Sequence, residues 1–230
     1  MITDITGTIY NGMWTYGDPY PPFKLAPLKQ PEWVSYTVVA DVFEGMNSQT
    51  GTYFETPGHF PSAGHNYMVE DVPFETLIDM PADVIHLRLP PPDPIRGYGK
   101  DRYRISGAEI AEALAGRAIP KGQALLIDTG WGPYWNAPFF LEGSPYFSYD
   151  AFMRLLALES RLMGSDLPRW ENLDDLQNLF PEFYKRDILM VGPCVNLDKI
   201  RAGGLLTILP LHILKSCCIP CRAFIRHGES

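Results

Sequence analysis

The side chains best suited to chemistry gather in one short segment of this 230-residue chain. Gln49, Tyr53 and Glu55 supply an amide, a phenol and a carboxylate, and His59 follows a Pro-Gly turn. If residues 49–55 are extended, side chains two positions apart share a face, so these groups converge. A carboxylate and an imidazole at one point can hold a metal ion or exchange protons with a substrate. Alternating polar residues are also typical of a solvated strand face.

The elements that must position this segment are short, apolar and bounded by proline or glycine. β-Branched and aliphatic runs predict strands at residues 35–43, 82–89, 124–128, 187–191, 205–211 and 219–225. Ser106 and Glu109 form a capping-box pattern, which predicts a helix near residues 106–117. Ser148 can cap a second helix, with an apolar stripe at Phe152, Leu155, Leu156 and Leu162. Many strands and few helices predict a mixed α/β fold with a large sheet content.

Composition and charge exclude several classes of protein. With 46% apolar and 20% charged residues, and no linker or repeat, we expect one globular domain over residues 1–230. The net charge of −8 and the lack of a basic stripe argue against a nucleic-acid partner. The sequence shows neither a signal-peptide pattern nor an apolar run of membrane-spanning length, so we expect a cytoplasmic protein with no membrane partner.

The four cysteines, Cys194, Cys217, Cys218 and Cys221, lie late in the chain, a poor layout for a disulfide framework. Cys218 and Cys221 have the C-x-x-C spacing of a metal or redox site. No second pair accompanies them, and the surrounding run is apolar. We therefore interpret the cysteines as buried core residues.

Two further groups are candidates for substrate binding. His65 follows His59 by six residues, in a Gly/Pro loop that could fold back beside it. Trp131 and Tyr134 belong to an aromatic cluster after Thr129-Gly130. Such a cluster suits either core packing or the wall of a mostly apolar pocket.

The segment from Gln49 to His59 resembles the cyclase-family signature H-x-G-T-H-x-D-x-P-x-H. Gly51, Thr52, Pro57 and His59 match it, and Glu55 replaces the aspartate. The likeness extends over residues 2–13, 122–135, 164–168, 191–197 and 209–222. The family contains metal-dependent hydrolases similar to kynurenine formamidase. The resemblance implies a swivelling β/β/α fold, a homodimer or homotetramer, and hydrolysis of an amide, lactam, lactone or ester by metal-activated water.

The same resemblance implies an altered metal site. Glu55 takes the role of the carboxylate ligand and His59 that of the last histidine, whereas Gln49 and Tyr53 stand where two ligand histidines belong. A later ligand histidine should fall in residues 179–182, where Glu182 is the only carboxylate. We expect no two-zinc centre, and either no metal or one divalent ion, Mn²⁺ or Zn²⁺, held by Gln49, Glu55 and His59. This oxygen-rich set suits Mn²⁺ better.

We therefore predict a hydrolase of a small cyclic or aromatic amide, lactam, lactone or ester, with His59, Glu55 and Tyr53 as catalytic residues and His65, Trp131 and Tyr134 near the substrate. Two alternatives stay open. The absence of the ligand histidines also fits a metal-independent isomerase, cyclase or dehydratase of secondary metabolism that uses the same acid and base groups. The third reading is a binding protein that keeps the scaffold without catalysis.

Overall fold

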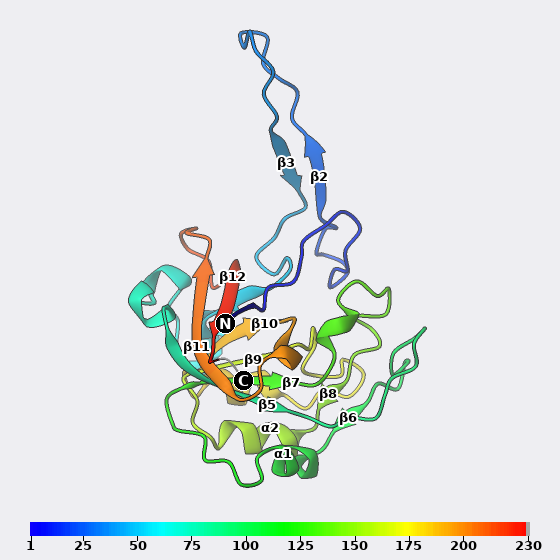
Figure 1. The fold of residues 1–230 in the computed structure, drawn as a ribbon, viewed down its shortest axis with the longest axis vertical. Helices are drawn as coiled ribbons and strands as arrows, with labels where there is room; N and C mark the ends of the chain where they lie inside the picture. Colours follow the sequence, from blue (N-terminus) through cyan, green and yellow to red (C-terminus); the bar gives the residue numbers. More distant parts are fainter. Residues whose placement is uncertain (229–230) are drawn as a thin grey trace.

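The computed structural model describes residues 1–228 and is built around one large sheet (Figure 1). Its strands are β1 (Ile2–Asp4), β4 (Tyr53–Glu55), β5 (Met80–His86), β7 (Ala124–Asp128), β9 (Leu162–Ser165), β10 (Leu189–Gly192), β11 (Gly203–Pro210) and β12 (Cys218–Arg226). They run in the order β1-β12-β11-β5-β7-β9-β10-β4, and β4 also pairs with β12. The sheet therefore closes into a seven-stranded, barrel-like ring, with β1 attached outside it.

Burial on both faces explains the apolar runs in the ring. Strands β5, β7, β9 and β10 are parallel, and every residue of β7 is buried. Ala124 and Leu126 pack into the core enclosed by the ring strands, whereas Leu125 and Ile127 pack into a second core with the helices. Parallel strands covered on both faces are expected to be continuously apolar.

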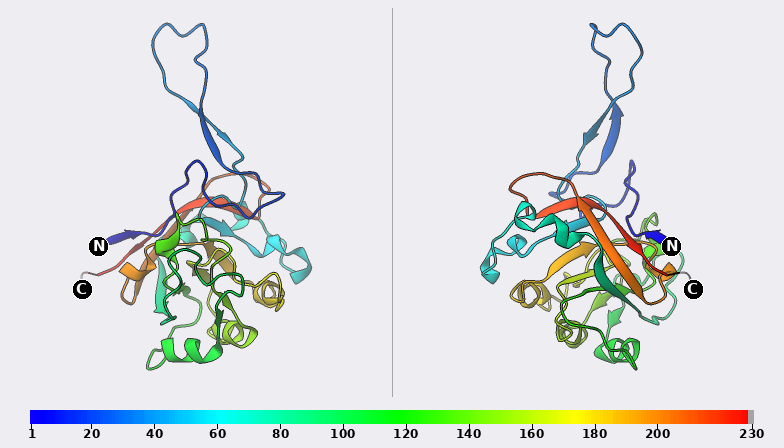
Figure 2. Two further views of the ribbon diagram at one scale, coloured as in Figure 1. Left: turned by 90° about the vertical axis from the view of Figure 1, so that its right-hand side faces the viewer. Right: turned by 60° about the vertical axis from the view of Figure 1, so that its left-hand side comes forward.

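Three α-helices cover one side of the ring (Figures 1 and 2): α1 (Gly107–Ala113), α2 (Tyr149–Leu156) and α3 (Leu179–Tyr184). The capping box is confirmed, because the Glu109 amide donates to Ser106 Oγ and the Ser106 amide donates to Glu109 Oε2. Ser148 caps α2 as predicted. Placing Leu162 on that helix was wrong. Glu159 adopts a φ of 55°, which ends the helical course, and Leu162 begins β9.

Short elements complete the chain. The 3₁₀ turns are η1 (Pro57–His59), η2 (Pro61–Ala63), η3 (Val69–Asp71), η4 (Phe74–Leu77), η5 (Gly132–Tyr134) and η6 (Leu197–Lys199). Strands β6 (Arg104–Ile105) and β8 (Tyr146–Phe147) form a small parallel pair.

Within residues 1–228, no helix has the length and apolar character needed to cross a membrane.

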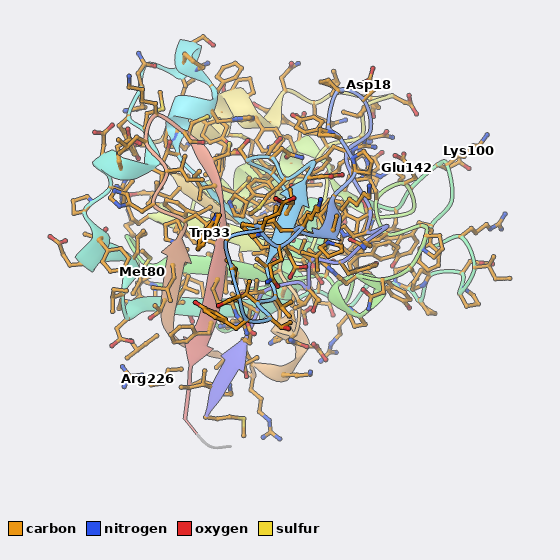
Figure 3. The ribbon with its side chains drawn as sticks, turned by 90° about the horizontal axis from the view of Figure 1, so that it is seen from above. Asp18, Trp33, Met80, Lys100, Glu142 and Arg226 are labelled. Atoms are coloured by element: carbon orange, nitrogen blue, oxygen red, sulfur yellow. The ribbon has the colours of Figure 1, made fainter. Side chains whose placement is uncertain are left out.

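A β-hairpin arm stands away from the ring (Figures 1 and 2). Strands β2 (Lys24–Pro27) and β3 (Asp41–Glu44) pair at its base, and residues 28–40 form its outer part. The strand predicted at 35–43 is therefore wrong over most of its length. Figure 3 looks along the arm from above and labels Trp33, which is 84% exposed; Val39 is 89% exposed. Two paired strands without a packed face are marginally stable by themselves.

Candidate active site

Gln49, Tyr53, Glu55 and His59 all line one pocket of about 600 Å³. The route by which they converge differs from the extended segment expected. Only Tyr53–Glu55 forms a strand, because Gly51 adopts a φ of 73° and turns the chain before it. A side chain at that position would also collide with Ile9.

Pairing on both edges of β4 fixes Glu55. It lies opposite Met190 of β10 on one side and opposite Cys218 of β12 on the other. Thr52, just before the strand, donates from Oγ1 to the Pro193 carbonyl at 2.6 Å. The Glu55 side chain is therefore held on a rigid element and is only 1% exposed.

A chain of polar contacts joins the lining side chains. The hydroxyl oxygens of Tyr16 and Tyr53 lie 3.2 Å apart, and Tyr16 also donates to the Pro168 carbonyl at 2.9 Å. Gln49 Nε2 lies 3.5 Å from the Tyr53 hydroxyl and 3.4 Å from Glu55 Oε2. His59 Nδ1 lies 3.8 Å from the same carboxylate oxygen. The amide, phenol, carboxylate and imidazole thus share one small region.

Burial changes the acid–base properties of this region. It raises the pKa of Glu55 to about 7, although His59, Cys218 and Gln49 favour the carboxylate. Burial also raises the pKa of Tyr53, and the neighbouring Tyr16 and Glu55 add to the effect. Glu55 can therefore exchange a proton near neutral pH, whereas Tyr53 keeps its proton and can donate a hydrogen bond.

The structure adds two residues that sequence reasoning missed. Cys218 Sγ lies 2.9 Å from Glu55 Oε2 and 3.1 Å from His59 Nδ1. Cys217 Sγ lies 3.8 Å from both His59 Nδ1 and Cys218 Sγ. Core packing alone does not account for this placement. The signal available in the sequence was the adjacent pair itself, but nothing local indicates that residue 218 pairs with residue 55.

The two thiols differ in acidity. A hydrogen bond from Cys218, together with the nearby His59, lowers the pKa of Cys217 to about 5. The same contact with Cys217, burial and the Glu55 carboxylate raise the pKa of Cys218. Cys217 is therefore the thiol that ionises first.

The remaining candidates lie elsewhere in the described chain. Trp131 is 1% exposed, donates from Nε1 to the Phe140 carbonyl and packs against Tyr134 in the core. His65 Nδ1 faces Asp187 Oδ1 at 3.9 Å. Glu182 of α3 pairs with Lys185 and Arg186. The aromatic side chains that do line the pocket are Tyr16, Tyr20, Tyr53, Phe60, Trp170, Phe180 and Tyr184.

The turn after β9 supports the pocket from behind. Buried Asp166 accepts hydrogen bonds from Oγ1 and the amide of Thr129 and from the amides of Trp131 and Gly132. Burial and the nearby Asp128 raise its pKa to about 7. The next two residues, Leu167 and Pro168, line the pocket. Asp166 therefore joins the loop after β7 to the pocket wall.

Comparison with known proteins gives a consistent assignment. The family model named Cyclase matches residues 3–172. An isatin hydrolase bound to the product analogue thioisatinate has a TM-score of 0.75 at 18% identity, covering 99% of this chain and 92% of that one. Isatin hydrolase A from Labrenzia aggregata, bound to benzyl benzoate, has a TM-score of 0.75 at 18% identity, covering 97% and 92%.

A protein described as a potential metal-dependent hydrolase with cyclase activity has a TM-score of 0.71 at 19% identity, and 99% of each chain is covered. At such identities the likeness establishes a shared fold. The search of curated proteins finds no match to this sequence.

Proposed function

Because the chain belongs to the cyclase family, we propose that it is a hydrolase that opens a small cyclic or aromatic amide, lactam, lactone or ester with the help of one divalent metal ion. The observation that carries this proposal is the placing of Glu55 and His59 together in an aromatic-lined pocket. A structural neighbour, isatin hydrolase, is described with a product analogue, thioisatinate. We also assign the fold to the swivelling β/β/α class on the strength of the family.

The pocket's size and lining support the substrate class. A volume of about 600 Å³ falls within the range of small-molecule sites. Phe60, Phe180 and Tyr184 offer flat apolar faces, and the Tyr16–Tyr53 pair offers hydroxyl groups. A planar ring that carries one carbonyl group would match both features.

The donors fit a metal ion. Gln49 Nε2 and His59 Nδ1 lie 3.4 and 3.8 Å from Glu55 Oε2, and this buried carboxylate has no lysine or arginine partner among residues 1–228. When bound, the ion would polarise the substrate carbonyl and activate water.

The chain's own residues have separable tasks. Glu55 would orient the attacking water and exchange its proton, because its pKa near 7 allows both protonation states. His59, on the pocket side of the same contact, would pass that proton to the leaving nitrogen or oxygen. Tyr53 would donate a hydrogen bond to the carbonyl oxygen as negative charge develops there.

The test combines metal content with turnover of a panel of formamides, lactones and lactams. We expect His59→Ala to lower turnover by roughly 100-fold or more. His65→Ala is the matched control, because His65 lies outside the pocket lining and should leave turnover unchanged. Full activity of the His59→Ala variant would contradict this mechanism.

A metal-independent acid–base enzyme is the second candidate. Glu55 near neutrality and the protonated Tyr53 form an acid–base pair without a metal ion. Turnover that persists unchanged in strong chelator would favour this reading. Loss of activity in chelator, with recovery on added metal, would reject it.

We further propose that the protein assembles as a homodimer or homotetramer through the arm. The hairpin extends away from the rest of the molecule and exposes Trp33, Tyr36 and Val39. A second copy of the chain would cover these side chains. Light scattering should show a smaller species for a Trp33→Ser, Val39→Ser double variant. Ile95→Ser, equally exposed in another loop, is the control. A monomeric parent protein would contradict the proposal.

A further inference from the structure

The two cysteines missed by the sequence analysis reach the pocket through strand pairing. Cys218 begins β12 and lies opposite Glu55 of β4 in an antiparallel register. Cys217 lies just outside the strand, where its carbonyl accepts from the Thr56 amide at 2.9 Å. Adjacent residues within a strand point to opposite faces. Because Cys217 lies outside the strand, its side chain can point to the same side as that of Cys218. Both sulfur atoms can therefore face His59, which ends η1.

Two of the three spacings between the donor atoms are close to those of a tetrahedral metal site, and the third is shorter. With Zn–S near 2.3 Å and Zn–N near 2.1 Å, two sulfur ligands lie about 3.8 Å apart and a sulfur and a nitrogen about 3.6 Å apart. The two Sγ atoms are 3.8 Å apart, and they lie 3.8 and 3.1 Å from His59 Nδ1. Glu55 Oε2 lies 2.9 Å from Cys218 Sγ but outside this group of three mutually close donor atoms, so it lies beside the ligand set and the fourth position stays open.

We propose that Cys217, Cys218 and His59 form a thiolate metal site with one open position, and that this site selects Zn²⁺ over Mn²⁺. This proposal concerns the metal site of the proposed hydrolase. The role of the ion in catalysis rests on the proposed function, whereas the binding of the ion does not. Thiolate sulfur favours zinc, whereas manganese favours oxygen donors. The buried Glu55 carboxylate and the Cys218 thiol also gain a cation to offset their burial.

This ligand set assigns different tasks to Gln49 and Tyr53, which stand where the family signature has histidines. Their contacts run to Glu55 Oε2 and to the Tyr16 hydroxyl, not to the cysteine sulfur atoms. They would act as substrate-binding and positioning groups, and with His59 Nδ1 on the ion the proton transfer would fall to Glu55. Sulfur donors at the start of β12 would replace the imidazoles that the signature has at positions 49 and 53.

The experiment uses the full chain, stripped of metal by a chelator and kept in reductant. Titration with Co²⁺ should give sulfur-to-cobalt charge-transfer absorption in the near ultraviolet, together with the intense visible bands of a tetrahedral ion. Added Zn²⁺ should displace the cobalt at one equivalent, whereas Mn²⁺ should not. Cobalt bound without charge-transfer absorption would overturn the proposal, as would displacement by Mn²⁺.

Variants locate the ligands. Cys217→Ser and Cys218→Ser should each remove about half of the charge-transfer intensity and weaken Zn²⁺ binding by at least about tenfold. Cys221→Ser is the matched control, because Cys221 lies in the same strand, is buried and has no place in the cluster. An unchanged spectrum in either of the first two variants would overturn the assignment.

A measurement on the unaltered protein covers the case in which a variant fails to fold. Zn²⁺ should protect Cys217 from iodoacetamide, as read by peptide mass spectrometry, and equal alkylation with and without Zn²⁺ would refute the site. The hydrolase proposal fails separately. A protein with the cobalt–sulfur band but no turnover of the substrate panel would refute only the function, and turnover without the band would refute only the site.

Discussion

Replacing Glu55 with glutamine should make the metal-free protein more stable at neutral pH. The carboxyl group is 1% exposed, and burial raises its pKa from the ordinary 4.5 to about 7. Between these values the folded protein keeps a proton that the unfolded chain has released, so the free energy of unfolding falls as pH rises. A pKa difference of one corresponds to about 1.4 kcal/mol, so the full loss approaches about 3 kcal/mol above pH 7.

Urea unfolding in chelator at pH values from 4.5 to 8 measures this effect. Glu55→Gln keeps the shape of the neutral carboxyl group and has no proton to lose. The variant should match the parent near pH 4.5 and exceed its stability by up to about 3 kcal/mol at pH 8. Glu182→Gln is the control, because Glu182 pairs with Lys185 and Arg186 on the surface of α3 and its pKa is lowered. Parallel pH profiles for Glu55→Gln and the parent would refute the argument.

Three further changes test other parts of the structure. Tyr53→Phe removes the hydroxyl that contacts Tyr16 and Gln49, and steady-state kinetics should show kcat lowered on the order of 100-fold with little change in Tm. Asp166→Ala leaves four buried donor groups without their acceptor, so urea unfolding should show a loss of about 3 kcal/mol or more. Leu126→Ala opens a cavity in the ring core and should cost about 2–5 kcal/mol in the same assay, with kcat unchanged.

The sequence by itself determined the features that depend on neighbouring residues. The capping box at Ser106 and the cap at Ser148 lie where predicted, because a cap is a hydrogen bond within one turn of helix. The buried run at residues 124–128 forms β7 with the predicted bounds, since burial on both faces leaves a continuous apolar pattern. The family signature also identified the segment that lines the pocket.

Only the tertiary structure decided which distant side chains meet. The pairing of Cys218 with Glu55 spans 163 positions and depends on the register between β4 and β12, which no local pattern encodes. The side chain of Trp131 is suited either to a pocket wall or to the core. In the structure it packs against Tyr134 and Phe140 in the core. The arm has strand-forming residues but no partner strand beyond its base, so local propensity over-predicted its sheet. The cysteine contact lies far along the chain, where sequence periodicity carries no information, and the other two outcomes depend on how nearby segments pack in three dimensions.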